Sequence, residues 1–228
     1  MIDISVLEKR IGIDFGDKNL LITALVRKSY ANENKNFDHN ERLEFLGDAV
    51  LSLIMAEFFY NNSPGHEGEL TVERGSLVNK EKLPIIATEM NLEEHLLIGK
   101  GEKMDVKARE KYLGDSLEAL IGAIFLEKGY EIAKQFVTDN FSSHMDLVLI
   151  ENLNNNPKGK FQEEALKRGP ENPSYKVLDE WGPDKNNDKH FRIGLFLKDE
   201  KVAEGEGTNT KEAEKKAAEK GLDLLSWS

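Results

Sequence analysis

The hydrophobic periodicity of the chain changes once, and the change divides it into two parts of different fold. Through residues 1–146 apolar side chains recur at the 3.6-residue spacing of helices, with few strand signals. Residues 151–157 (ENLNNNP) are polar, rich in asparagine and closed by a proline, which is typical of a linker. Beyond them, residues 190–198 alternate with the period of a half-buried strand. The pattern predicts a helical part followed by a smaller mixed part.

The first part is interrupted between its second and third predicted helices, where Gly65 and Gly68 follow Pro64. In this first part of the chain we expect helices over residues 17–28, 40–61, 70–90, 109–128 and 130–146. The second part predicts a helix, three strands and a final helix, over residues 160–167, 175–178, 190–198, 201–206 and 210–225. Asn209, with Glu212 three residues on, resembles a capping box for the last helix. The expected fold is an all-α domain over 1–148, a linker over 149–157 and a small α+β (α-β-β-β-α) domain over 158–228.

The composition indicates the cell compartment in which such a chain is expected to work. The 228 residues suffice for two domains of ordinary size, and none is a cysteine, which excludes disulfides and zinc–thiolate sites and agrees with a reducing cytoplasm. No run of apolar residues is as long as the roughly eighteen residues that a membrane-spanning helix needs. The first residues of the sequence also lack the basic-then-apolar pattern of a signal peptide. We therefore expect a cytoplasmic protein with no membrane partner. Of the net charge of −11, −10 lies in residues 1–154 and −1 in 155–228. An acidic part that can gather cations thus precedes a part that tolerates a polyanion.

Two short segments carry acidic residues at helical spacing. In the first, NERLEFLGD, the acids stand three and four residues apart, so one helical face presents all three: Glu41, Glu44 and Asp48. In the second, GDSLEALIG, Asp115 and Glu118 have the same three-residue spacing. Most of the remaining circumference of both segments is apolar, and a carboxylate on a largely buried helix needs a partner. Packed face to face, the two helices are expected to bring four or five carboxylates together.

A divalent cation is the economical partner for these acids. Arg42 is the one basic residue in either segment that could neutralise them. Every candidate ligand is an oxygen donor, which suits Mg²⁺ or Mn²⁺. Di-iron helical bundles use Glu-x-x-His, and none of the five histidines has a glutamate three residues before it. Each acid taken alone could be a solvated helical side chain, whereas the joint set indicates a metal site suited to phosphodiester hydrolysis.

The first segment resembles the nine-residue signature of the ribonuclease III family, the endonucleases of double-stranded RNA, without a mismatch. The second resembles that family's other acidic motif, with Gly114 where alanine is usual. The resemblance implies that Glu44, Asp115 and Glu118 bind Mg²⁺, for which Mn²⁺ can substitute. It also implies that Asp48 and Glu118 are catalytic.

Further expectations follow from the same resemblance. Glu41 and Glu67 match family positions near the RNA or the metal. The implied reaction is attack of water on a phosphodiester bond, leaving 5′-phosphate and 3′-hydroxyl ends. The implied role is processing of ribosomal and other structured RNA precursors. A two-fold homodimer would supply one acid set to each strand of a duplex.

The order helix, three strands, helix resembles the double-stranded-RNA-binding domain appended to this family. Such a domain reads A-form shape through 2′-hydroxyl and phosphate contacts, and the amino end of the last helix favours phosphate. The implied RNA-binding residues are Gln162, Glu163, Lys185, Lys211 and Lys215. Thr210 precedes Lys211 where the family has a basic pair, so we expect salt-sensitive binding.

Two other functions are to be weighed. A catalytically silent RNA-binding protein of this fold would be expected to lack a member of the acid set, and Glu44, Asp48, Asp115 and Glu118 are all present. A helical metal hydrolase of small phosphate esters would have no use for a duplex-reading domain. The sequence therefore favours an endoribonuclease.

Overall fold

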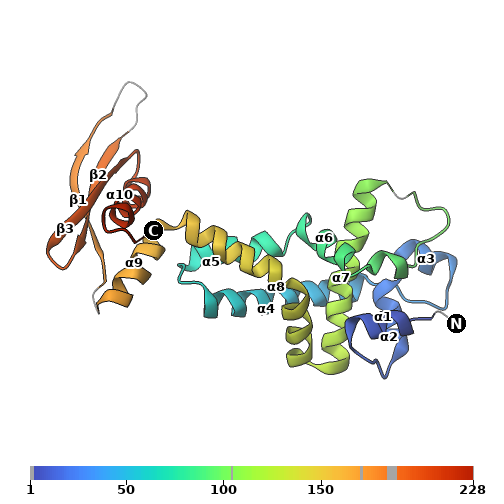
Figure 1. The fold of residues 1–228 in the computed structure, drawn as a ribbon. Coiled ribbons are helices and arrows are strands. Elements are labelled where there is room, and N and C mark those ends of the chain that lie inside the picture. The colour runs from blue at the N-terminus through green and yellow to red at the C-terminus, as the bar shows by residue number, and fades with distance from the viewer. Residues whose placement is uncertain (1–2, 104, 170–171, 184–188, 228) are drawn as a thin grey trace. The chain divides into compact units, whose positions relative to one another are not determined.

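The computed structural model describes residues 3–103, 105–169, 172–183 and 189–227 (Figure 1). The chain divides into two compact units, one up to Val148 and the other from Leu149 onward. The described part of the first unit is helical, and the second holds a three-stranded sheet with helices. The expected fold class is confirmed. Over the described residues, no helix combines the length and the apolar character that crossing a membrane requires.

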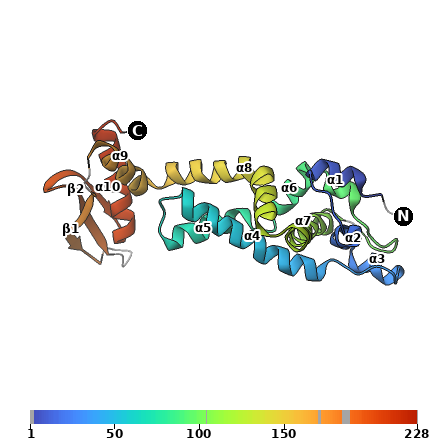
Figure 2. The ribbon, with the colours of Figure 1, turned by 90° about the horizontal axis from the view of Figure 1, so that it is seen from below.

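The first unit is built around one long helix, α7, which packs against α2, α4 and α6 (Figure 2). The helices of this unit are α1 (Ser5–Ile11), α2 (Lys18–Leu25), α3 (Lys28–Glu33), α4 (Glu41–Asn62), α5 (Glu67–Leu77), α6 (Lys82–Glu89), the 3-10 helix η1 (Leu92–His95), α7 (Val106–Lys128) and α8 (Tyr130–Asn155). Asp105 begins α7 as its N-cap, because its carboxylate accepts the backbone N–H of Ala108 at 2.8 Å. Gly129, at φ 83°, ends it.

Apolar side chains surround most of α7. Leu113, Leu117, Leu120 and Ile124 recur at three- and four-residue intervals and are at most 1% exposed. Burial of this stripe fixes the helix in the middle of the unit. Asp115 and Glu118, on the same helix, are partly buried, whereas residues nearer its start such as Glu110 and Lys111 are exposed.

Two glycines let α4 and α7 cross at the distance of main-chain contact. A Cβ atom at Gly47 would lie 1.7 Å from the carbonyl oxygen of Glu118, and one at Gly122 would lie 2.4 Å from that of Leu43. Only hydrogen fits at either position without movement of a helix. The crossing brings the acid-bearing turns of the two helices next to each other.

The single helix predicted over 70–90 is wrong. The structure has α5 and α6 with a break between them, because Asn79 bonds to the main chain in a way that competes with a continuous helix. Its side-chain oxygen accepts the backbone N–H groups of Glu81 at 3.0 Å and Lys82 at 2.8 Å. Pro84 then falls in the first turn of α6, where a missing N–H costs little.

Other boundaries differ at the ends of elements. The predicted helix 17–28 is α2 followed by the separate short helix α3, and α1 was not predicted. The segment from 151, interpreted as an irregular linker, is helical as far as Asn155, where α8 ends. The predicted helix 40–61 agrees with α4 to within one residue.

The second unit consists of helix α9 (Pro157–Arg168), strands β1 (Ser174–Trp181), β2 (His190–Leu197) and β3 (Glu200–Gly207), and helix α10 (Thr210–Leu224). The sheet is antiparallel with order β1-β2-β3. Both helices lie on one face of it (Figures 1 and 2). Between them and the sheet lies a core that includes Phe161, Leu195, Ala217 and Leu222. The predicted cap is confirmed, since the side-chain oxygen of Asn209 accepts the N–H of Glu212 at 2.9 Å.

Candidate active site

A cavity of about 430 Å³ opens where α4 crosses α7. Its lining includes the acids of both sequence segments and two cations: Arg27, Glu41, Glu44, Phe45, Asp48, Lys111, Asp115 and Glu118. The expected meeting of the two acidic helices is thus found in the structure. With all groups ionised, five carboxylates and two cations give the lining a formal charge of −3. This excess of negative charge in one hollow favours a bound cation.

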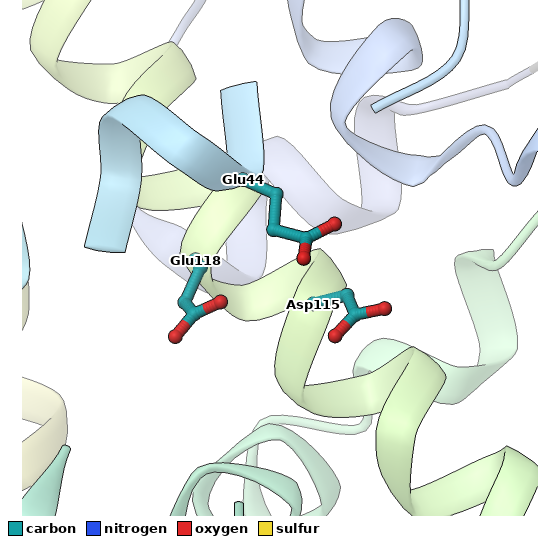
Figure 3. Close-up of side chains that lie close together, drawn as sticks. All are labelled: Glu44, Asp115 and Glu118. Carbon is teal, nitrogen blue, oxygen red and sulfur yellow. The ribbon is translucent and has the colours of Figure 1, made fainter. Parts of the chain in front are cut away.

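Three of these carboxylates converge, as Figure 3 shows for Glu44 from α4 and for Asp115 and Glu118 from α7. One oxygen atom from each lies within 4.8 Å of the others. Opposite ligands of an octahedral Mg²⁺ ion are about 4 Å apart, because each bond is about 2.0–2.1 Å long. Small side-chain rotations would bring the three oxygens to such an ion. The donor set and its spacing therefore fit a hard divalent cation.

Burial and mutual repulsion disfavour the ionised forms of two carboxyl groups in the cluster. Burial raises the pKa of Glu118 to about 8, and the neighbouring carboxylates of Asp48, Glu44 and Asp115 add to this effect. Burial and the charge of Asp115 likewise raise the pKa of Glu44. A bound dication would oppose both shifts by stabilising the ionised carboxylates.

The other two acids of the first segment lie at the rim. Asp48 is exposed, and after burial its negative charge contributes most to raising the pKa of Glu118. Glu41 is also exposed, and its carboxylate accepts hydrogen bonds from Lys28 Nζ at 3.1 and 3.2 Å. Hydrogen bonding from Lys28 lowers the pKa of Glu41. Asp48 thus lies close enough to Glu118 for its charge to act on that carboxyl group, whereas Glu41 has a cation of its own.

The counter-charges of the site are not those expected. Arg42, the one basic residue in the acidic segments, is exposed and does not line the cavity. Asp115 instead accepts Arg27 Nη1 at 2.8 Å and Lys111 Nζ at 2.5 Å, both on Oδ2. Lys111 was within reach of sequence reasoning, since it stands four residues before Asp115 on the same helical face. Arg27 was not, because it comes from a segment 88 residues away.

A buried amide ties the start of α4 to the rest of the site. The side chain of Asn40, fully buried just before α4, donates to the carbonyl oxygen of Ala24 at 3.3 Å and to Ser116 Oγ at 3.4 Å. Ser116 lies beside Asp115 on α7, and Glu44 is one turn into α4. This contact therefore holds the two acid-bearing turns against each other.

The remaining candidate residues lie elsewhere. Glu67 is exposed at the first position of α5 and is not among the residues that line the cavity. In the second unit, Gln162 and Glu163 are exposed on α9, and Lys211 is exposed in the first turn of α10. Lys215 is exposed one turn after Lys211, and Lys185 lies outside the described residues.

Acids from two helices around one cavity, on a chain that continues into an α-β-β-β-α domain, are the features of a nuclease with a duplex-binding module. A family model described as Ribonuclease-III-like matches residues 17–145, and one described as Double-stranded RNA binding motif matches residues 157–225. The chain belongs to the ribonuclease III family, and it is an endoribonuclease of double-stranded RNA.

Relatives match over almost the whole chain. Ribonuclease 3 of Protochlamydia amoebophila (strain UWE25) is 39% identical over 222 residues, which cover 96% of this chain and 90% of the relative. Ribonuclease 3 of Bdellovibrio bacteriovorus is 40% identical over 222 residues, which cover 96% and 94%. The shared region thus includes both units.

Solved structures are similar as well. One of the nuclease domain of ribonuclease III from Campylobacter jejuni, in which a flexible region is involved in dimer formation, has a TM-score of 0.56 and 41% identity. It covers 62% of this chain and 97% of that one. Dicer from Pichia stipitis, with a TM-score of 0.51 and 23% identity over 92% of this chain and 95% of that one, shares the fold.

Proposed function

We propose that this chain hydrolyses phosphodiester bonds of double-stranded RNA with Mg²⁺ at the α4–α7 cavity, leaving 5′-phosphate and 3′-hydroxyl ends. The observation that carries the proposal is the convergence of Glu44, Asp115 and Glu118, with an oxygen of each within 4.8 Å of the others. These three residues would hold the ion. Mn²⁺, which accepts the same oxygen donors, is expected to substitute.

The protein's own residues have separate tasks in this reaction. A bound Mg²⁺ supplies Lewis-acid chemistry, which makes water a better nucleophile and stabilises negative charge on the phosphate. Asp48, exposed at the same cavity as Glu118, accepts a hydrogen bond from the attacking water and orients it. The new bond joins the water oxygen to phosphorus as that water gives up a proton to solvent, the bond from phosphorus to the 3′ oxygen breaks, and the 3′ oxygen takes up a proton from solvent. Asp48 and Glu118 are thus the proposed catalytic residues, and Glu41 and Glu67 are proposed to lie near RNA.

Replacing Glu118 by glutamine tests the site. Glu118→Gln removes one ligand charge at nearly constant volume, so cleavage of a long duplex RNA with Mg²⁺ should be lost while duplex binding is retained. Glu110→Gln is the matched control, because Glu110 is exposed on the same helix and does not line the cavity. Cleavage by Glu118→Gln at the rate of the control would refute the assigned role.

The RNA-binding surface is proposed to comprise exposed residues of α9 and α10. Gln162 and Glu163 can meet 2′-hydroxyl groups of the minor groove, and Lys211 and Lys215 can meet phosphates. Lys185 is proposed as a further contact. Replacing Lys211 and Lys215 by alanine should lower duplex affinity and reduce the salt dependence by about one unit of slope per lysine.

Lys220→Ala provides a control for that experiment. Lys220 is exposed on the same helix, two turns beyond Lys211 and its phosphate-facing end. The control should bind duplex RNA like the unaltered chain at each salt concentration. Equal slopes for the double variant and the control would exclude the two lysines from the interface.

A homodimer is proposed because a duplex has two strands and each chain carries one acid set. Large apolar side chains on α4 are unusually exposed: Phe45 is 80%, Leu53 56% and Tyr60 77% exposed. Such exposure on a helix marks an interaction surface. Leu53→Glu should convert a dimer to a monomer in sedimentation measurements, whereas Val106→Glu, at another exposed apolar position, should not. A Leu53→Glu dimer of unaltered stability would contradict this interface.

The proposed setting is the cytoplasm, and the proposed role is maturation of ribosomal and other structured RNA precursors. Depletion of the protein from its cells should lead to accumulation of unprocessed ribosomal precursor, measurable by RNA blotting. Complementation with the chain, but not with its Glu118→Gln variant, should restore processing. Full processing after depletion would remove this role and leave the nuclease activity untouched.

A further inference from the structure

Asp115 holds two cations on a single oxygen atom. Its Oδ2 accepts Arg27 Nη1 at 2.8 Å and Lys111 Nζ at 2.5 Å. The Asp115 side chain is 13% exposed, so this carboxylate is neutralised inside the cavity wall. The other convergent acids, Glu44 and Glu118, show no such ion pair among the described residues. Both cations therefore pair with the same candidate ligand, Asp115.

Arg27 and Lys111 differ in how strongly the surrounding residues restrict them. The Arg27 side chain is 12% exposed, and its guanidinium lies over the ring of Tyr112 at 4.1 Å. Tyr112 in turn donates to Glu102, which also accepts from Ser29. Arg27 is thus largely buried and held by two contacts, with Asp115 and with the Tyr112 ring.

Lys111 lacks this support. Its side chain is 60% exposed and reaches Asp115 from one turn earlier on α7. An ammonium on a flexible, exposed stem exchanges its partner for water at little cost. Of the two cations, Lys111 is the one that can give up its place.

The positive charge of Lys111 also acts on the other two carboxyl groups of the cluster, Glu44 and Glu118. It opposes the upward shifts in the pKa of both Glu44 and Glu118, although burial and the neighbouring acids prevail. Lys111 also lines the same cavity as the three convergent carboxylates. A divalent ion entering that cavity would meet both the ligands and this ammonium group.

We propose that Lys111 acts as an internal competitor of the metal: it occupies Asp115 when no divalent ion is present and is displaced when one binds. The proposal rests on the proposed function above, because that function places a metal ion at Asp115. Lys111 then sets the metal concentration at which the site fills, and Arg27 stays behind to orient Asp115.

Titration of the full chain with Mn²⁺ alone, followed by calorimetry at constant ionic strength, tests the proposal. Lys111→Gln should bind Mn²⁺ roughly three- to tenfold more tightly than the unaltered chain, since one competing and repelling charge is gone. Lys107→Gln is the control, because Lys107 is an exposed lysine on the same helix that does not line the cavity. It should bind like the unaltered chain. Equal affinity in all three proteins would overturn the proposal.

A second variant and a second readout separate competition from a structural role. Lys111→Arg keeps the charge and should keep the weaker binding; tight binding by this variant would also overturn the proposal. In melting experiments, Lys111→Gln should be less stable than the unaltered chain in chelator and gain more stability on addition of Mn²⁺. A purely structural lysine would lower both melting temperatures equally.

The outcome also distinguishes this inference from the proposed function. If the unaltered chain binds no Mn²⁺ and cleaves duplex RNA in chelator, the metal-dependent function itself fails. If the unaltered chain binds Mn²⁺ and cleaves, while Lys111→Gln has the same affinity, only the competition by Lys111 fails.

Discussion

Replacing Gly47 by alanine tests whether the main-chain crossing of α4 and α7 sets the spacing of the acids that line the cavity. The added methyl group would lie 1.7 Å from the carbonyl oxygen of Glu118 and 2.9 Å from the backbone nitrogen of Gly122. Ordinary contact begins at 3.4 Å, so the two helices must separate by about 1.7 Å along the closer line. The obstacle is backbone, and no side-chain rotation can remove it.

The size of the effect follows from two opposing contributions. Overpacking of a protein interior typically lowers the free energy of unfolding by about 1–3 kcal/mol. Because the obstacle here is rigid backbone, we expect a cost of about 3 kcal/mol. Alanine in place of glycine within a helix returns about 0.5–1 kcal/mol. The free energy of unfolding should therefore fall by about 2 kcal/mol. Since a 1 Å misplacement of reacting groups can cost about a hundredfold in rate, cleavage should fall by at least that factor.

Urea unfolding followed by circular dichroism, together with a duplex-RNA cleavage assay, measures both effects. Gly75→Ala is the control, because Gly75 is exposed within α5 and a Cβ there meets nothing within 4 Å. The control should be more stable than the unaltered chain by about 0.5–1 kcal/mol, with unaltered cleavage. If Gly47→Ala unfolds at the same urea concentration as Gly75→Ala and cleaves normally, the crossing does not set the site.

Three other outcomes are expected. Asn40→Ala, which removes the buried amide that bonds to Ala24 and Ser116, should lower the free energy of unfolding by about 1–2 kcal/mol in urea; an unchanged midpoint would show that the amide is dispensable. With metal chelated, stability should fall as pH rises from about 5 to 8, because the folded chain holds a proton on Glu118, whose pKa is about 8, and the unfolded chain, at the ordinary value of 4.5, does not. A flat profile would contradict the raised pKa. Glu118→Gln should remove this slope and melt at a higher temperature than the unaltered chain in chelator at pH 8; a lower melting temperature would argue against a buried charge there.

The long helices could be predicted from sequence because their apolar faces are continuous. The predicted helix 40–61 agrees with α4 to within one residue, and the strand pattern of 190–198 agrees with β2 to within one residue. The helix predicted over 70–90 failed at Asn79, whose side chain replaces helical hydrogen bonds with local ones. Periodicity counts apolar positions and does not detect such competition.

The site residues, too, could be predicted from the sequence only in part. The acids could be found from sequence because their spacing puts them on one face of each helix. The same spacing rule could have found Lys111, four residues before Asp115 on α7, but it could not have found Arg27. Arg27 reaches Asp115 across 88 residues, and the expectation that Arg42 was the one candidate considered only the acidic segments. Long-range ion pairs depend on how helices pack, which a single sequence does not display.

Gly47 and Gly122 bring the main chain of α4 against that of α7, next to Glu118. Peptide groups have the same dimensions in every protein, so the choice of other side chains cannot make this crossing wider or narrower. The backbone positions that carry Glu44, Asp115 and Glu118 are therefore set by the crossing. Redesign of the cavity for a larger ion would have to use the reach of the side chains, as in an exchange of aspartate and glutamate, or move entire helices.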